Sequence, residues 1–473
     1  MSSYPTPRPR PRLRSKSDRA QWQGVEMLES RMLLAADSLS VFIGGAAAKA
    51  VQFIDPNGTK AIIRMSGQGN ATVTFSGADL AQGPSPSGIA VSGSGVTLSS
   101  IAMSRTGLTT ILHVMTIGRN MVSVGGITSD GVVASILAPG VVVTGDITTA
   151  GWVHEVLLGG AQDGTISIGP THINGGLKFT AGSVTDESLA SDIRIDSLTA
   201  SQWLNTTGAA ESITAPQALS IRVRGSFQPD LTISGINGAQ VSLQTFSAGA
   251  ISGGTWNVTG KVHVLSAGSI ATGWTGTIAG AINSFNVSHD AEMDLTAAEI
   301  GSMVVHGALS NSTVTLTQPL AASGFDMNSL FVGGAMIDST IRSAGSVNVV
   351  SIGSMQDSNL YVGLVNPALP AVTSDFANTA EIRSITLRRS ASASFSGSNI
   401  AAYQLGAVVL GAVATSNGGT PFGVAGHSIN SITLVDQTTR RSAHETNVPN
   451  AGAFDQLLVT RGIAQGDLVV EIV

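Results

Sequence analysis

A short phrase that recurs about every twenty residues is the feature that most constrains the fold of this chain. Residues 281–363 show it most clearly: an apolar strand, a turn of small residues, an acidic or Ser/Asn corner, and a second apolar strand. Val287, Val305, Val332 and Ile352 occupy the same place in successive copies, at spacings of 18, 27 and 20 residues. A unit of two short strands cannot bury its own apolar face, so it must stack on its neighbours. The repeat therefore predicts a solenoid.

Composition decides which kind of solenoid this is. Hydrophobic residues make up 42% of the 473 residues, charged residues only 11% and aromatic residues 4%, and there are 56 glycines. Such a chain is too apolar for disorder and too poor in charge for a helical bundle. Alternating apolar and small polar residues place one side chain in and the next one out. We predict an all-β fold whose residues 101–440 form a right-handed parallel β-helix of about 15–17 rungs, at about 20 residues each.

Flanking segments complete the predicted organisation. Residues 38–100 are expected to form a small β module that caps the solenoid, because residues 51–65 read as a hairpin around an Asp-Pro-Asn-Gly turn. Asp55 and Asn57 in that turn lack the further acidic ligands of a calcium loop. Residues 441–473 are expected to be a β segment or cap. Residues 161–211 and 364–380 break the repeat, and we interpret them as insertions or irregular rungs.

The basic and acidic residues are unevenly distributed. Residues 1–31 carry seven basic and three acidic groups, whereas the rest carries 17 basic and 27 acidic ones. Alternating Pro and Arg in residues 1–24 predict a disordered basic leader, which we extend to residues 1–37. The acidic body has no basic stripe for nucleic acid. Residues 400–413 form the most apolar run, but it is too short for a transmembrane span and contains Gln404.

A short motif follows the Arg-rich segment. Residues 28–34 read LESRMLL, which resembles the LEPR-XLL motif near the N-terminus of planctomycete exported surface proteins. The matching residues are Leu28, Glu29, Arg31, Leu33 and Leu34, and Ser30 replaces the proline of the family pattern. The resemblance implies export, a cell-surface or extracellular location, and a β-helix body behind the leader.

Candidate catalytic residues are sparse. The absence of cysteine removes disulfides and thiolate sites. The densest acidic patch beside a histidine consists of His289, Asp290, Glu292 and Asp294, and His306 is expected nearby on an adjacent rung. A metal or acid–base site is one interpretation of this patch, and a solvated corner is the default. Residues 426–428 (Gly-His-Ser) resemble the Gly-His-Gly of pectin-degrading hydrolases, without their partner motifs.

These observations favour a binding role over catalysis. We assign no catalytic, cofactor-binding or metal residue, and no cofactor. We expect an exported structural or adhesive protein of the cell surface that contacts envelope or matrix glycans or other surface proteins. Two alternatives stay open. One is a carbohydrate-active enzyme of the polysaccharide lyase or hydrolase type on a β-helix, and the other is a self-associating subunit of a larger envelope assembly.

Overall fold

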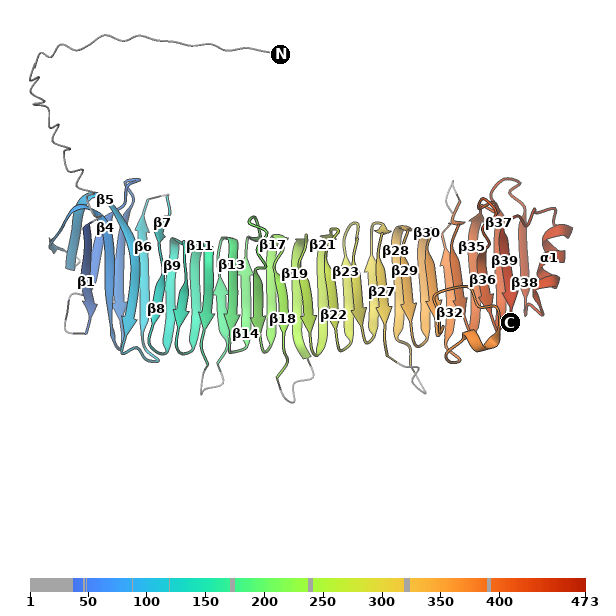
Figure 1. Cartoon of the computed structure of the whole chain (residues 1–473), viewed down its shortest axis with the longest axis horizontal. Coiled ribbons are helices and arrows are strands. Elements are labelled where there is room, and N and C mark those ends of the chain that lie inside the picture. Colours follow the sequence, from blue (N-terminus) through green and yellow to red (C-terminus); the bar gives the residue numbers. More distant parts are fainter. Residues whose placement is uncertain are drawn as a thin grey trace, which may run out of the picture.

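The computed structural model is a long rod of strands stacked side by side (Figure 1). It describes residues 37–45, 47, 49–86, 88–118, 120–170, 175–236, 241–318, 324–388 and 393–473. The described part of the chain is 64% strand with a single α-helix, and its parallel strands form a β-solenoid of about 14 turns. The predicted all-β parallel β-helix is confirmed.

One column of inward-facing residues follows the solenoid from end to end. Its members are paired from strand to strand and are all buried, and they define one face, called the first face here. Neighbouring members are 18 to 35 residues apart, so an average turn is longer than twenty residues. This is why there are about 14 turns rather than the 15–17 expected. The column is Leu112, Ile136, Val156, Phe179, Leu198, Ile221, Phe246, Leu265, Phe285, Met303, Leu330, Val350, Ile385, Val408 and Ile432.

The first face comprises one strand from each turn, and the longer strands bend at its end onto a second face. Its strands are β6 (Ile111–Ile117), β9 (Val133–Val143), β11 (Val153–Ile168), β12 (Leu177–Thr180), β14 (Ile195–Ala200), β17 (Ala218–Phe227), β19 (Val241–Ile251), β21 (Lys261–Ile270), β23 (Ile282–Val287), β25 (Ile300–Val305), β28 (Met327–Ile337), β30 (Val347–Gln356), β32 (Glu381–Leu387), β35 (Gln404–Val413) and β37 (Ser428–Asp436).

The second face also has short strands of its own, and β13 (Ser183–Ser191) and β11 continue from it onto the third face. The short strands are β7 (Val122–Val124), β15 (Gln202–Leu204), β26 (Leu309–Ser310) and β33 (Phe395–Ser396). The remaining strands of the third face are β8 (Ile127–Ser129), β10 (Ile147–Thr149), β16 (Ser212–Ala215), β18 (Asp230–Ile233), β20 (Thr255–Val258), β22 (Thr275–Ile278), β24 (Asp294–Ala297), β27 (Thr313–Leu316), β29 (Thr340–Ser343), β31 (Asn359–Val362), β34 (Asn399–Ala402), β36 (Phe422–Gly426) and β39 (Leu468–Ile472).

Aromatic rings fill the middle of the solenoid. Phe227, Phe246, Trp256 and Trp274 are buried and lie edge to face along the axis, with ring centroids 4.5 to 5.7 Å apart. Edge-to-face pairs add roughly 0.5–1.5 kcal/mol each beyond area burial. Trp256 and Trp274 are therefore core residues and not surface platforms.

Buried serines line the bend between the second and third faces near the C-terminal end. Ser339 Oγ accepts the backbone N–H of Ser312 at 3.1 Å and donates to the Ile337 carbonyl at 2.7 Å. Ser358 and Ser398 repeat this arrangement on the next two turns. Each hydroxyl thereby joins one turn to its neighbour and satisfies a backbone donor that the bend leaves without a strand partner.

Antiparallel strands cover the N-terminal end of the rod. The predicted hairpin is confirmed, since β2 (Ala50–Ile54) and β3 (Lys60–Ser66) pair antiparallel. Asp55 closes its turn by accepting the backbone N–H groups of Asn57 and Thr59, and Gly58 has φ +78°. Antiparallel pairing extends to β6, and it also joins β4 (Asn70–Ser85) to β1 (Asp37–Gly44) and β5 (Gly88–Ser104).

A helix that the repeat pattern does not predict lies at the C-terminal end (Figure 1). It is α1 (Ala451–Thr460), and it follows β38 (Ser442–Thr446), which pairs antiparallel with β37. Asn450 caps α1, because its Oδ1 accepts the N–H of Ala453 at 2.9 Å. Phe454 and Leu458 on one side of α1 are buried. The last segment of the chain is therefore part helix and part strand.

The two segments that break the sequence repeat differ in the structure. The interpretation of residues 161–211 as an insertion or irregular rung is wrong for most of their length, since β11, β13, β14 and β15 pair in parallel with their neighbours. Polar residues at the bends hide the repeat there. Residues 364–380 do leave the stack, and they include the short 3₁₀ helix η1 (Thr373–Asp375).

Candidate functional site

The predicted histidine and acidic patch is spread around a bend of the solenoid. Asp290 Oδ1 accepts the backbone N–H of Ala308 on the next turn at 2.7 Å. Glu292 is half-buried beyond that bend, and Asp294 is exposed on the third face as the first residue of β24. These carboxylates belong to different parts of the turn and do not converge on one point.

The two histidines of the patch lie on neighbouring turns, as expected from their spacing, but they face different neighbours. His289 Nδ1 lies 2.9 Å from the Gly268 carbonyl of the preceding turn. The ring of His306 packs edge-on against Phe331 of the following turn, with centroids 5.9 Å apart. Phe331 also forms a cation–π contact with Arg388, whose guanidinium carbon lies 4.7 Å from the ring centroid. The structure therefore gives each imidazole a separate structural contact.

The Gly-His-Ser segment at residues 426–428 is also structural. The ring of His427 stacks on Tyr403 with centroids 4.5 Å apart. Its Nδ1 lies 2.7 Å from the carbonyl oxygen of Val473. His427 thus ties the end of the chain to the wall of the rod.

Two further kinds of feature are absent from the described ranges. No group of three or more His, Cys, Asp or Glu side chains among them is placed to hold a metal ion. None of the helices in that part of the chain has the length and apolarity needed to cross a membrane. The LEPR-XLL-like residues 28–34 lie outside the described residues.

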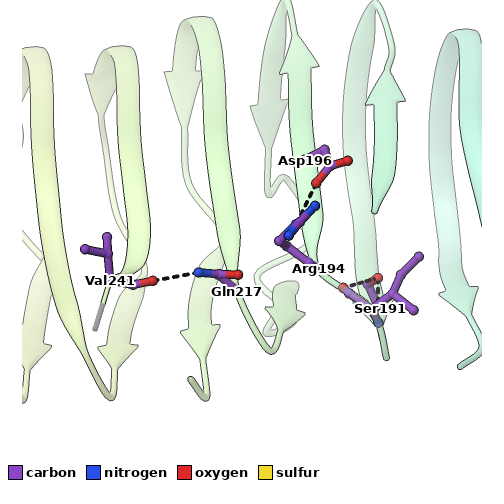
Figure 2. Close-up of polar contacts among 6 residues, drawn as sticks. Ser191, Arg194, Asp196, Gln217 and Val241 are labelled. Carbon is purple, nitrogen blue, oxygen red and sulfur yellow. Dashed lines mark hydrogen bonds and ion pairs between the residues drawn. The ribbon is translucent and has the colours of Figure 1, made fainter. Parts of the chain in front are cut away.

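Polar contacts at the bend between the third and first faces are structural as well (Figure 2). Gln217 Nε2 donates to the carbonyl of Val241 on the next turn at 2.7 Å, and Ser191 Oγ donates to the carbonyl of Ile193 at 2.9 Å. Arg194 Nε and Asp196 Oδ1 form an ion pair at 2.7 Å. Both side chains of this pair are partly exposed, so it adds little to stability.

A row of hydroxyl side chains along the third face is a regular surface feature of the rod. Ten consecutive turns contribute one outward residue each in direct register, and eight of the ten are Thr or Ser. All ten are exposed or half-exposed, and none of their side chains forms a hydrogen bond to another described residue. We call this row the hydroxyl ladder: Thr128, Thr148, Ser167, Ala190, Thr214, Thr232, Asn257, Thr277, Thr296 and Thr315.

A companion row lies beside the ladder, two residues earlier on the same strands. Two aspartates of this row bind the backbone of the next turn. Asp146 accepts the N–H of Thr165 at 2.9 Å, and Asp230 accepts the N–H of Thr255 at 2.6 Å. The remaining members are mostly Ser and Thr. Strand geometry places neighbours within a row about 4.8 Å apart and the two rows about 6.6 Å apart. The result is a flat lattice of short polar groups with few free charges.

The ladder ends where the third face becomes covered. Its row continues through Arg342 to Tyr361 and then to Ala401 and Ala425. Tyr361 and the two alanines are buried, and they pack with residues of the 364–380 segment. Arg342 Nη2 holds that segment by donating to the carbonyl of Val365 at 2.9 Å. The row thus consists mainly of Thr and Ser where it is exposed to solvent, and of Tyr361, Ala401 and Ala425 where the 364–380 segment covers it.

Two glutamates that the sequence pattern does not single out are buried. Glu187 lies on β13 and is fully buried, and Glu211 holds the equivalent place on the next turn with 7% exposure. Burial, together with the nearby charges of Asp146 and Asp163, raises the pKa of Glu187 to about 8, although the backbone of Gly164 favours the charged form. Since the side chain is fully buried, the neutral form of this core carboxyl group is favoured near neutral pH.

No protein-family model, curated protein or solved structure matches this chain.

Proposed function

We propose that this protein is an exported, non-catalytic scaffold of a cell surface, and that the hydroxyl ladder is the wall by which it contacts neutral matrix glycan. The observation that carries the proposal is the ladder itself, a straight row in register over ten turns. A rigid periodic surface favours a partner that is also periodic, and linear polysaccharides are. The LEPR-XLL-like residues 28–34 support the export half of the proposal by resemblance alone.

The chemistry of the ladder fits sugar hydroxyls. Each Thr offers a hydroxyl donor and acceptor beside a methyl group, and sugars present the same combination. A single such hydrogen bond is worth only about 0.5–1.5 kcal/mol net. Because the ladder repeats the contact on every turn, a long glycan makes many contacts at once and binds more tightly than a short oligosaccharide. Binding should therefore increase steeply with glycan length.

Non-catalytic action is proposed from the placement of the titratable groups. The patch around His289 and Asp290 is spread over one bend, and each imidazole is engaged elsewhere. Glycoside hydrolysis needs two carboxyl groups facing each other across one bond. Glu187 and Glu211 hold equivalent places on neighbouring turns, and both are buried.

A depletion assay with insoluble neutral polysaccharides tests the ladder. The full chain is mixed with washed particles, and the protein left in solution is measured. Thr232→Lys introduces a bulky charge into the exposed row and is expected to weaken binding at least about tenfold, since a solvated ammonium must be displaced. Thr245→Lys on the first face is the matched control and should bind as the parent does. Equal binding by all three proteins would exclude the ladder as the contact surface.

Export is tested separately by fractionating the native host. The protein is expected in the envelope or culture fluid. Its confinement to the cytosol would overturn the surface location and leave only the binding property of the ladder.

A further inference from the structure

A basic depression opens on the outer side of the first face at the N-terminal end of the rod. Arg64 on β3 lies directly opposite His113 on β6, and His113 lies opposite Leu137 on β9. Ile63 and Met65 on either side of Arg64 are buried, so alternation turns Arg64 outward. The same argument applies to His113, which lies between the buried residues Leu112 and Val114.

The depression has the size and mixed lining of a ligand site. Its volume is about 590 Å³, within the range of about 300–1,000 Å³ typical of small-molecule pockets. Lys49 and Pro86 contribute from the ends of the neighbouring loops, while the half-buried side chains of Ile111 and Leu137 supply apolar surface. A ligand there would meet charged groups and apolar carbon at once.

The charge of the depression is opposite to that of the body around it. Residues 32–473 carry 17 basic and 27 acidic groups, yet no Asp or Glu is among the described residues that line the depression. The side chains of Lys49, Arg64 and His113 form no hydrogen bond or ion pair with other described residues. Two cationic side chains and an imidazole are therefore available to an anion, and an arginine fork matches a carboxylate in both shape and charge.

From this arrangement we infer that the depression binds the carboxylate of an acidic sugar, a uronic acid residue of an anionic glycan. Arg64 pairs with the carboxylate, and Lys49 adds a second cation. His113 hydrogen-bonds a ring substituent, and the C–H face of the sugar ring packs on Ile111 and Leu137. The inference rests on the proposed glycan contact, but it concerns a second surface and a charged class of glycan that the hydroxyl ladder does not select.

Titration calorimetry with the full chain tests the inference. The probes are oligouronates of two to six residues, neutral oligosaccharides of the same lengths, and an oligoglutamate peptide. We expect the oligouronates to bind and the neutral oligosaccharides to bind at least about tenfold more weakly, with the preference lost at high salt. An oligoglutamate that binds as tightly as the oligouronates would overturn the assignment to a sugar in favour of an acidic peptide.

Variants locate the site. Arg64→Gln is expected to reduce oligouronate affinity at least about tenfold, because the bidentate pair is lost. Arg224→Gln, which changes an exposed arginine of β17, is the matched control and should leave affinity unchanged. Circular dichroism of both variants excludes loss of fold. Equal loss in the two variants would reduce the effect to general charge and contradict the inference. Thr232→Lys should leave oligouronate binding intact, so failure of the ladder and failure of the depression are distinguishable.

Discussion

At the scale of single residues, Glu187 shows that the solenoid core can hold a buried carboxyl group. A carboxyl group with no exposure is far costlier charged than neutral, and this explains its raised pKa of about 8. The ordinary pKa of a glutamate, 4.5, applies in the unfolded chain. Between these two pH values the folded state holds a proton that the unfolded state has lost. The stability gained by the neutral form is complete below pH 4.5 and is lost as the pH rises toward 8.

Glu187→Gln should remove that pH dependence. The free energy of unfolding of the parent should fall by on the order of 1 kcal/mol per pH unit between about pH 5 and 8 relative to the variant. Denaturant unfolding at several pH values measures the difference. Glu155→Gln, at a half-exposed position on the first face, is the control, and its free energy of unfolding should depend on pH as that of the parent does. If the free energy of unfolding of Glu187→Gln also depended on pH as that of the parent does, the carboxyl group of Glu187 would not be buried.

The serines at the bends make a second residue-scale prediction. Ser339→Ala leaves the backbone N–H of Ser312 without its acceptor in a buried place, which costs about 1–3 kcal/mol. Calorimetry should show a lower melting temperature. Ser351→Ala on the outward side of β30 is the control and should change it little. An unchanged melting temperature for Ser339→Ala would mean that water replaces the hydroxyl.

At the scale of elements, the sequence predicts what depends on periodicity and misses what depends on position. The β2–β3 hairpin is predictable, because Asp55 and Gly58 are the residues that its turn requires. The stacking of the strands is predictable from alternation. The number of turns is not, since a loop such as residues 364–380 lengthens one turn without adding another. Residues 161–211 mislead because Asp186 and Glu187 look like a solvated corner, although Glu187 is buried.

The helix α1 has a local sequence signal of its own, which is separate from the strand repeat. Asn450 is a favourable N-cap, Gly462 follows the end with φ +63°, and Phe454 and Leu458 are four residues apart on one face. The hydroxyl ladder also had a signal, in the Thr-Xaa-Thr pairs of the third-face strands. Recognising it as a single surface required the strand register, which fixes the residues that lie side by side.

Since α1 covers the C-terminal end of the solenoid, a charge in its buried face should detach α1 and expose the last strands. Leu458→Asp is expected to lose hydrogen-exchange protection in α1, β37 and β39 while residues 260–360 keep theirs, because each turn of a solenoid contacts only its neighbours. The exposed end should also associate with other copies, seen by light scattering as a mass that rises with concentration. Val459→Asp, at an exposed position one residue later, is the control. Uniform loss of protection along the rod would show that the protein unfolds as one unit.

At the scale of the whole molecule, the fold gives a long wall rather than a cleft. About 14 turns at about 4.8 Å each make a parallel stretch on the order of 67 Å long, closed by antiparallel strands at one end and by α1 at the other. The hydroxyl ladder occupies one side of this rod, and the basic depression lies near the N-terminal end of another. Small-angle scattering should give a rod-like profile for the body. A compact globular profile would contradict the stacked arrangement.

We propose that this rod binds glycan without cleaving it. The most direct measurement incubates the purified full chain with the polysaccharides that deplete it from solution, and follows bound protein and newly formed sugar ends together over time, with and without calcium. We expect stable binding and no rise in sugar ends above a protein-free control. A steady release of ends in proportion to protein concentration would contradict it and identify the protein as a carbohydrate-active enzyme.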